Sequence, residues 1–320
     1  MQADGQSGGA GVMGGIDPAL LIAALLTASV PILLAAVGEL VVERAGVLNL
    51  GVEGMMILGA ICGFITAVET GSPLAGFIGG AAGGAVLSLL FAVLVLVMQA
   101  NQVASGLALT LFGLGLSSLI GQGYVGIKPP LTGAVPFGPL AELPFLGRVL
   151  FSHDLLVYLS VALVAGVWAF LKFTRGGLVL RAVGESHEAA HALGYKVLRI
   201  RLMAIAFGGA MAGLGGAYLS LVRVPQWVDG ITAGAGWIAL AIVVFASWQP
   251  WRALLGAWLF GGISVLQLNL QVAEVGIPVE YLSMSPYLIT IIVLVIMSSG
   301  KGRASFAAPA CLGQNFHAAR

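Results

Sequence analysis

The chain has 320 residues, of which 59% are hydrophobic and only 8% are charged, and its mean hydropathy is +1.04. Soluble domains carry roughly 25% charged residues, so a soluble fold could not bury this much apolar surface, whereas lipid solvates it. The net charge of +1 argues against a general attraction to nucleic acid. Cys62 and Cys311 have no ligand spacing, so neither a disulfide framework nor a metal site is indicated. The composition predicts a polytopic α-helical protein of the lipid bilayer.

Nine apolar segments are candidate transmembrane helices. Residues 1–18 before them are Gly-rich and polar and lack the Lys/Arg start of a signal peptide, so a flexible N-terminal segment is expected. A flexible tail is expected for residues 300–320. The predicted fold class is all-α, a bundle of about eight to ten transmembrane helices within residues 19–299. The nine segments lie near 19–42, 55–69, 74–98, 103–122, 154–173, 202–222, 235–248, 253–272 and 286–299.

Positive charge is concentrated around one loop, residues 174–201, between the fifth and sixth segments. Five of the 14 Lys and Arg residues lie in this loop, and a sixth, Lys172, lies just before it. Short loops rich in Lys and Arg are retained on the cytoplasmic side, so this loop is predicted to be cytoplasmic. Alternation from it places eleven of the 14 basic residues inside, the N-terminus outside and the C-terminus in the cytoplasm. The six residues are Lys172, Arg175, Arg181, Lys196, Arg199 and Arg201.

Motifs for nucleotide binding and for metal-dependent catalysis are missing from the sequence. Gly300-Lys301 is followed by Gly302 and does not complete a phosphate-binding loop, and neither HExxH nor CxxC occurs. His187 and His191 are spaced i and i+4, but two ligands without a third are more typical of a solvated helix face than of a metal site. We therefore expect no catalytic residue, no metal and no cofactor in this chain, which is not predicted to be an enzyme.

The middle of the basic loop predicts a short helix. Ser186 is a suitable N-cap, Glu188 and the alanines after it suit the first turns, and Gly194 is a natural stop. A helix of this kind could fit a groove on a cytoplasmic partner. A solvated amphipathic linker is the alternative that the charge pattern alone favours.

The pattern Glu188-Ala189-Ala190-x-x-x-Gly194, followed by the Gly-rich segment 207–217, resembles the EAA loop of ABC importer permeases. In that family the loop forms a coupling helix that docks on the ATPase subunit. The Ile-x-Leu-Pro ending of maltose-type loops is absent, so the match is to the branched-chain amino acid, ribose and nucleoside branch. The resemblance implies an ATPase-coupling site made of Glu188, Ala189, Ala190, Gly194, Arg181, Gly184 and Glu185.

Two further blocks are similar to the same family. The run Asn49-Leu50-Gly51-Val52-Glu53-Gly54-Met55 resembles the Asn-Leu-Gly-x-Glu-Gly-Met segment of bacterial nucleoside-type permeases, where sugar permeases carry an Asp-Leu-Ser-x-Gly version. The block from Gly236 to Trp251 resembles a later conserved segment. These similarities span residues 38–299 and favour the nucleoside branch over the sugar branch.

Polar residues inside the apolar segments are candidates for a substrate path. Intramembrane carboxylates and broken helices are functional candidates by default. For Glu53, bonds to backbone amides or a pair with Arg44 are equally reasonable, and for the uncharged residues interhelical hydrogen bonds are the commoner role. The candidates are Asn49, Glu53, Asn101, Gln102, Thr110, Gln267 and Asn269.

The resemblance implies a permease subunit of an ABC importer in the bacterial cytoplasmic (inner) membrane. Its expected partners are a cytoplasmic ABC ATPase that holds ATP and Mg²⁺, a second permease that is identical or homologous, an extracytoplasmic substrate-binding protein and the lipid bilayer. Transport of a nucleoside or purine-like solute by alternating access is the implied activity. An ion-gradient-driven secondary transporter is the alternative.

Overall fold

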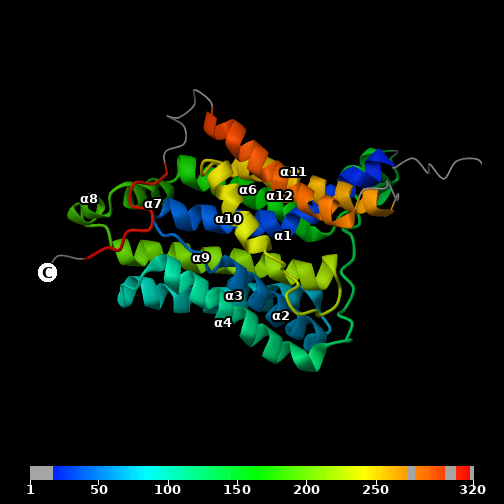
Figure 1. Ribbon diagram of the computed structural model, residues 1–320, viewed down its shortest axis with the longest axis horizontal. Coiled ribbons are helices and arrows are strands. Elements are labelled where there is room, and N and C mark those ends of the chain that lie inside the picture. Colours follow the sequence, from blue (N-terminus) through cyan, green and yellow to red (C-terminus); the bar gives the residue numbers. More distant parts are fainter. Residues whose placement is uncertain (1–16, 144, 273–277, 300–307, 318–320) are drawn as a thin grey trace, which may run out of the picture.

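The computed structural model describes residues 17–143, 145–272, 278–299 and 308–317, and all regular secondary structure in these ranges is helical. Seven of the helices are long and apolar enough to cross a bilayer. They run side by side along the long axis of the molecule (Figure 1). The fold class expected from the sequence is thus confirmed. The seven are α1 (Pro18–Arg44), α2 (Val52–Thr70), α3 (Pro73–Ala92), α4 (Gln102–Gly121), α6 (Leu155–Phe173), α9 (Val197–Tyr218) and α11 (Pro250–Val272).

Short turns and helices complete the described chain. A π-helical turn extends α3 to Val97, another extends α9 to Arg223, and a 3₁₀ turn extends α4 to Tyr124. A further 3₁₀ turn, Gly138–Glu142, lies in the connection between α4 and α6. The other helices are α5 (Leu146–Leu150), α7 (Arg175–Glu185), α8 (His187–Ala192), α10 (Ala235–Phe245) and α12 (Val279–Ser299).

Each of the nine predicted apolar segments overlaps with one of these helices. The helix in the seventh segment, α10, has only 11 residues. At 1.5 Å per residue it is about 16 Å long, roughly half of a bilayer core. The chain that leads into it, residues 224–234, is made of bends and turns. This segment and α10 together therefore take the place of one continuous helix.

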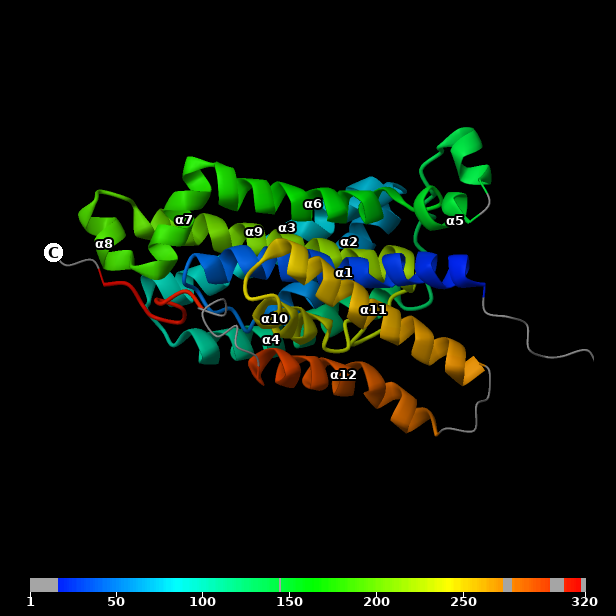
Figure 2. The same ribbon diagram turned by 90° about the horizontal axis from the view of Figure 1, so that it is seen from above.

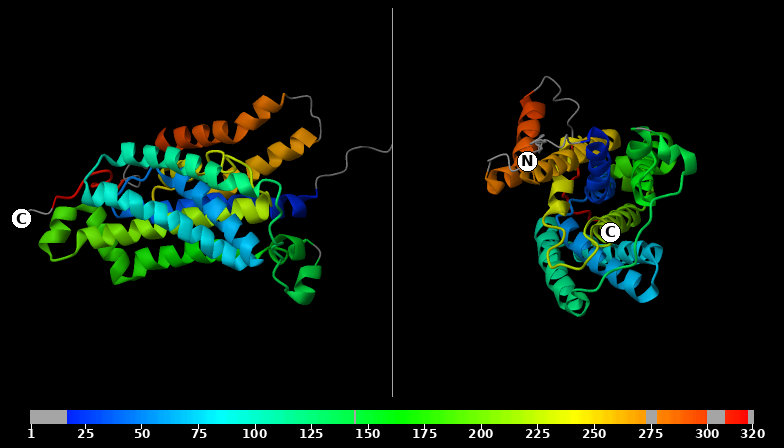
Figure 3. Two further views of the ribbon diagram at one scale, coloured as in Figure 1. Left: turned by 90° about the horizontal axis from the view of Figure 1, so that it is seen from below. Right: turned by 90° about the vertical axis from the view of Figure 1, so that its right-hand side faces the viewer.

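The two ends of the described chain lie at opposite ends of the bundle. Helix α1 begins at the end that carries α5, whereas α7, α8 and residues 308–317 lie at the other end (Figure 2). Helix α12 lies at the periphery, where it packs on α11 and α10 (Figure 3). This arrangement fits an odd number of crossings, and which end faces the cytoplasm stays a prediction.

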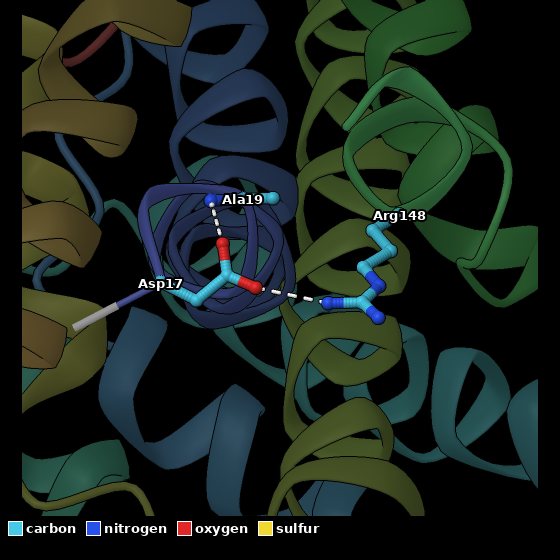
Figure 4. A network of polar contacts seen from close by, with 3 residues as sticks. All are labelled: Asp17, Ala19 and Arg148. Carbon is cyan, nitrogen blue, oxygen red and sulfur yellow. Dashed lines mark hydrogen bonds and ion pairs between the residues drawn. The ribbon is translucent and has the colours of Figure 1, made fainter. Parts of the chain in front are cut away.

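The start of α1 is tied to the α5 region by one ion pair. Asp17 caps the helix, because its Oδ1 accepts a hydrogen bond from the Ala19 amide at 2.9 Å, and its Oδ2 lies 2.9 Å from Arg148 Nη1 (Figure 4). Both side chains are substantially exposed, so this pair contributes at most about 1 kcal/mol. It orients the α5 region without holding the bundle together.

Helices α2, α3 and α9 form the closest-packed part of the bundle. Gly213 of α9 faces Gly80 and Gly84 of α3 on one side and Gly59 of α2 on the other. A Cβ atom at Gly213 would lie 2.9 Å from the Gly84 Cα and even closer to the Gly80 carbonyl. Lipid supplies no hydrophobic drive between helices, so close backbone contact of this kind is what holds them together.

We expect Gly213→Ala to destabilise the bundle by about 1–3 kcal/mol, because the added methyl group must push α3 away from α9. Gly115→Ala is a matched control in α4, since a Cβ there meets nothing within 4 Å. The melting temperature in detergent should fall for Gly213→Ala and stay within a degree or two for Gly115→Ala. Equal melting temperatures for the two variants would contradict the packing described.

Candidate functional site

Residues 45–51 fold back into the bundle between α1 and α2. Asn49 donates from its backbone amide to Glu39 Oε1 at 3.3 Å and from Nδ2 to Glu39 Oε2 at 3.2 Å. Because Glu39 lies five residues before the end of α1, Asn49 sits about 7.5 Å deeper than that end. Helix α2 therefore begins inside the bundle. We call residues 45–51 the re-entrant segment.

Helix α4 supplies the other partners of the re-entrant segment. The Leu48 amide donates to Gln102 Oε1 at 2.8 Å, and Thr110 Oγ1 donates to the Leu50 carbonyl at 3.1 Å. Gln102 and Thr110 are both buried. Non-helical backbone at this depth has no water to bond to, so these side chains satisfy groups that would otherwise cost several kcal/mol each, of the order of 2–7.

The Glu53 carboxylate lies at the start of α10, where it accepts three hydrogen bonds. Thr232 Oγ1 donates to Oε1 at 2.6 Å, the Gly234 amide donates to Oε1 at 2.9 Å, and the Gly236 amide donates to Oε2 at 2.7 Å. A Cβ at Gly236 would lie 2.6 Å from the Glu53 Cα, so only glycine permits this approach. The negative charge faces the positive end of the α10 dipole, which stabilises it.

The structure decides between the two sequence-based alternatives for Glu53. It bonds backbone amides, as one of them proposed, while the Arg44 guanidinium donates to the Trp248 carbonyl at 3.1 and 3.2 Å. Trp248 Nε1 in turn donates to Glu43, which is buried beside the end of α1. Arg44 and Trp248 thus join the end of α1 to the end of α10.

Four of the seven predicted path residues come together around the re-entrant segment, namely Asn49, Glu53, Gln102 and Thr110. Asn101 is exposed and caps α4, where its Oδ1 accepts from the Ala104 amide at 3.0 Å. The last two lie on α11: Gln267 Nε2 donates to Ser283 of α12 at 3.4 Å, and Asn269 Nδ2 donates to the Val265 carbonyl at 2.8 Å. All seven make hydrogen bonds within the protein, to the re-entrant segment, to a helix end or to another part of a helix. A substrate contact for any of them stays a prediction.

Sequence reasoning missed several members of this site. Glu39 and Thr232 are the partners of Asn49 and Glu53, and both are buried. Glu39 and Glu43 are spaced i and i+4 in an apolar helix. Because intramembrane carboxylates require partners, this spacing could have predicted a polar contact there. No comparable signal marks Thr232, whose role depends on a contact 179 residues away in sequence.

We expect Glu53→Gln to lower the stability of the protein by about 1–3 kcal/mol. The amide NH₂ cannot accept a hydrogen bond, so one buried donor at the start of α10 loses its partner. Thr232→Val, which leaves both glycine amides bonded to the carboxylate, should cost about 1 kcal/mol. The check is thermal unfolding in detergent, and a Glu53→Gln protein as stable as the wild type would contradict the role given to this carboxylate.

The predicted short helix in the basic loop is present as α8. The Ser186 side chain caps it by accepting from the Ala189 amide at 3.2 Å, and Gly194 follows it with a φ of +88°. Glu188 and Ala189 are exposed, whereas Ala190 is buried against α7 and α9. The helix lies at the tip of the bundle (Figure 2), so one face is available to a partner.

The other predicted coupling residues belong to α7. Glu185 is exposed and Arg181 is half-buried, whereas Gly184 is buried against the Arg44 carbonyl at the end of α1. Gly184 also accepts a hydrogen bond from the Cys311 amide at 2.9 Å. The end of α7 is therefore fixed to α1 on one side and to residue 311 on the other.

Arg201, counted among the charges of a solvated loop, is fully buried. Its Nε donates to the Ala45 carbonyl at 3.1 Å, its Nη1 to the Gln314 carbonyl at 2.9 Å and its Nη2 to His187 Nδ1 at 3.2 Å. The guanidinium thus links α9 to the re-entrant segment, to the C-terminal residues and to α8. The sequence alone did not indicate this role.

The neutral form of His187 is required by the bond from Arg201, since Nδ1 must be unprotonated to accept. Burial lowers the pKa of His187, and repulsion from Arg201 and His317 lowers it further, while Glu188 acts in the opposite direction. The unfolded chain therefore binds the proton more readily. The stability contributed by neutral His187 is complete above the ordinary histidine pKa of about 6.5 and is lost as the pH falls through the lowered value.

We expect hydrogen-exchange protection of the Ala190 and Gly194 amides, corrected for the intrinsic rate, to fall as the pH is lowered from 7 to about 5. Both amides are hydrogen-bonded within the α8 turn. His187→Asn places a non-titrating acceptor near the Nδ1 position and should flatten this dependence. The nearby His191 ring packs on Phe316, and an unchanged pH profile in His187→Asn would assign the effect to another group.

Comparison with known proteins identifies the family. Residues 21–297 match the family described as branched-chain amino acid transport system / permease component, so the chain belongs to it. It is 40% identical to the putative glucose ABC transporter permease protein TsgC13 of Haloferax volcanii, over 93% of this chain and 97% of that protein. It is 31% identical to the guanosine ABC transporter permease protein NupQ of Bacillus subtilis, over 86% and 91% of the two chains.

A third relative is the nucleoside ABC transporter permease protein NupC of Lactococcus lactis, which is 31% identical over 87% of this chain and 92% of its own. The chain is thus a multi-pass permease subunit of an ABC transporter, a transport component rather than an enzyme. The resemblance seen in the EAA-like loop and the Asn49–Met55 block is confirmed at this level. The relatives are named for both sugars and nucleosides, so they leave the substrate class open.

Proposed function

We propose that this permease moves a nucleoside or purine-like solute inward by alternating access, driven by a separate ATPase that docks on α8. The observation that carries the docking step is the exposed face of α8 at the tip of the bundle, with the largely exposed side chain of Leu193 beside it. An apolar side chain held in water by a short capped helix suits burial in a groove of a partner protein. ATP and Mg²⁺ would reside in that partner.

An uncharged polar solute suits the groups inside the bundle. The only carboxylate at the start of α10 in the described structure is that of Glu53, which already occupies the amide groups that could otherwise attract an anion. The Asn49–Met55 block and the two relatives named for guanosine and nucleosides support the nucleoside class. Glucose is a second candidate, favoured by the 40% identity to a putative glucose permease.

The remaining partners follow from the family. A second permease, either a copy of this chain or a related one, would complete the channel, and an external binding protein would deliver the solute at the end that carries α5. Both belong to the proposal because ABC importer permeases work as pairs fed by such a protein. The bundle would lie in the cytoplasmic membrane with α7 and α8 inside.

The experiment is uptake into proteoliposomes that contain the permease pair with and without its ATPase and binding protein. Labelled guanosine should enter only with all components and ATP, and an uncoupler should have no effect. Saturable uptake by the permease alone that an uncoupler abolishes would show a secondary transporter instead. Uptake of glucose and not guanosine would replace the nucleoside assignment and leave the ATP-driven mechanism intact.

Gly194→Val should uncouple transport from ATP hydrolysis while leaving membrane insertion intact. Gly194 has a φ of +88°, where a β-branched residue is strained, so the end of α8 must shift. Gly71→Val is the matched control, since Gly71 has a φ of +65°, meets nothing within 4 Å and lies between α2 and α3. We expect uptake to fall at least tenfold for Gly194→Val alone. Full uptake by both variants would remove the docking role of α8.

A further inference from the structure

The C-terminal residues 308–317 lie across the tip of the bundle beside α7 and α8, in red in Figures 1 and 2. We call them the C-terminal strap. They belong to the tail expected from the sequence to be flexible, yet Cys311 and Phe316 are buried. The strap is therefore part of the folded structure at the end that carries the proposed docking helix.

Hydrogen bonds tie the strap to three separate parts of the chain. The Cys311 amide donates to the Gly184 carbonyl of α7 at 2.9 Å, and the Gln314 carbonyl accepts from Arg201 of α9 at 2.9 Å. Asn315 Nδ2 donates to the Gln99 carbonyl at 2.7 Å in the connection between α3 and α4. These contacts connect the strap to α7, to α9 and to the connection between α3 and α4, and thus to the transmembrane helices.

Asn315 also connects the strap to the re-entrant segment. Its Oδ1 accepts from Gln102 Nε2 at 3.2 Å, and Gln102 Oε1 accepts from the Leu48 amide at 2.8 Å. Gln102 thus uses both ends of its side chain, one toward the strap and one toward residues 45–51. The strap is in this way joined to the interior of the bundle through a single buried side chain.

Phe316 fills a small hydrophobic core that is separate from the main one. The buried residues of this core are Val183 of α7, Ala190 of α8, Val197 of α9 and Phe316 itself. The Phe316 ring also packs edge-to-face on His187 and His191, with centroids 5.3 Å away in each case. In this core α8 contributes Ala190 and the strap contributes Phe316.

Helix α8 has six residues, whereas isolated helices shorter than about 12 residues are marginal in water. Apart from the strap, it is held by the Ser186 cap, by the buried Ala190 and by the buried His187, which accepts a hydrogen bond from Arg201. The Phe316 ring packs on two side chains of this short helix, His187 and His191, and shares the small core with Ala190. Loss of that ring would leave a cavity under the helix.

We propose that the C-terminal strap fixes α8 in its docking orientation, with Phe316 as the positioning residue. This rests on the proposed docking function of α8 and adds that the ATPase-facing surface is assembled from two distant parts of the chain. Movement of α8 relative to the bundle would have to carry the strap with it, through Gly184, Arg201 and Asn315. The strap thus makes the docking helix and the transmembrane helices move as one body.

The first test reports on the strap alone. In a Cys62→Ala background Cys311 is the only cysteine, and its buried thiol should react slowly with a water-soluble maleimide. Phe316→Ala should raise the labelling rate at least tenfold, while Phe316→Leu should largely restore protection. Gln314→Ala is the matched control, because it keeps the backbone carbonyl that bonds Arg201 and removes only an exposed side-chain bond to the Ala310 carbonyl within the strap. Equal protection in Phe316→Ala would overturn the anchoring role.

The second test measures ATP-driven uptake and co-purification of the ATPase in the same variants. Both should fall at least fivefold in Phe316→Ala and remain unchanged in Gln314→Ala. If Phe316→Ala inserts poorly, Asn315→Ala, which removes the link to Gln99 and Gln102, provides a milder variant with the same expected direction. Fast Cys311 labelling combined with normal uptake would overturn the proposal. Normal uptake in Gly194→Val as well would place the failure in the docking function of α8 instead.

Discussion

A backbone that leaves the helical conformation inside a bilayer must find all its hydrogen-bond partners within the protein. Two segments of this permease do so, residues 45–51 and 224–234, and much of the polar chemistry inside the bundle serves them. Glu39, Gln102 and Thr110 satisfy the first segment, and Glu53 satisfies the end of the second. These four polar residues are therefore partners of broken backbone, which explains why they lie around the re-entrant segment and the start of α10.

The same constraint joins the interior to the tip of the molecule. The Arg44 side chain, at the end of α1, donates to the Trp248 carbonyl just after α10. The backbone carbonyl of the following residue, Ala45, accepts a hydrogen bond from Arg201. Arg201 also bonds His187 of α8. The beginning of the re-entrant segment thus lies between the short helix α10 and the loop that carries α8. Coupling between α10 and α8 would pass through these residues.

The composition and the lengths of the apolar segments were sufficient to predict the helices, because an apolar segment of spanning length must be helical in lipid. The nine segments, the short helix after Ser186 and the Gly-rich packing face of α9 followed from local sequence. The partners of Glu53 did not, and neither did Ala45 and Gln314 as partners of Arg201, because each comes from a segment more than 100 residues away in the chain. The tail was expected to be flexible from its polar composition, and the small core that receives Phe316 cannot be seen without the positions of α7, α8 and α9.

The position of the strap has a practical consequence for handling the protein. A purification tag fused after Arg320 would begin only a few residues beyond His317, beside α8 and the surface assigned to the ATPase. The described chain begins with α1 at the opposite end of the bundle, so a tag on that side is attached away from α8. Under the proposed docking of an ATPase on α8, a tag at the C-terminal side is expected to weaken recovery of the complex more than a tag at the N-terminal side.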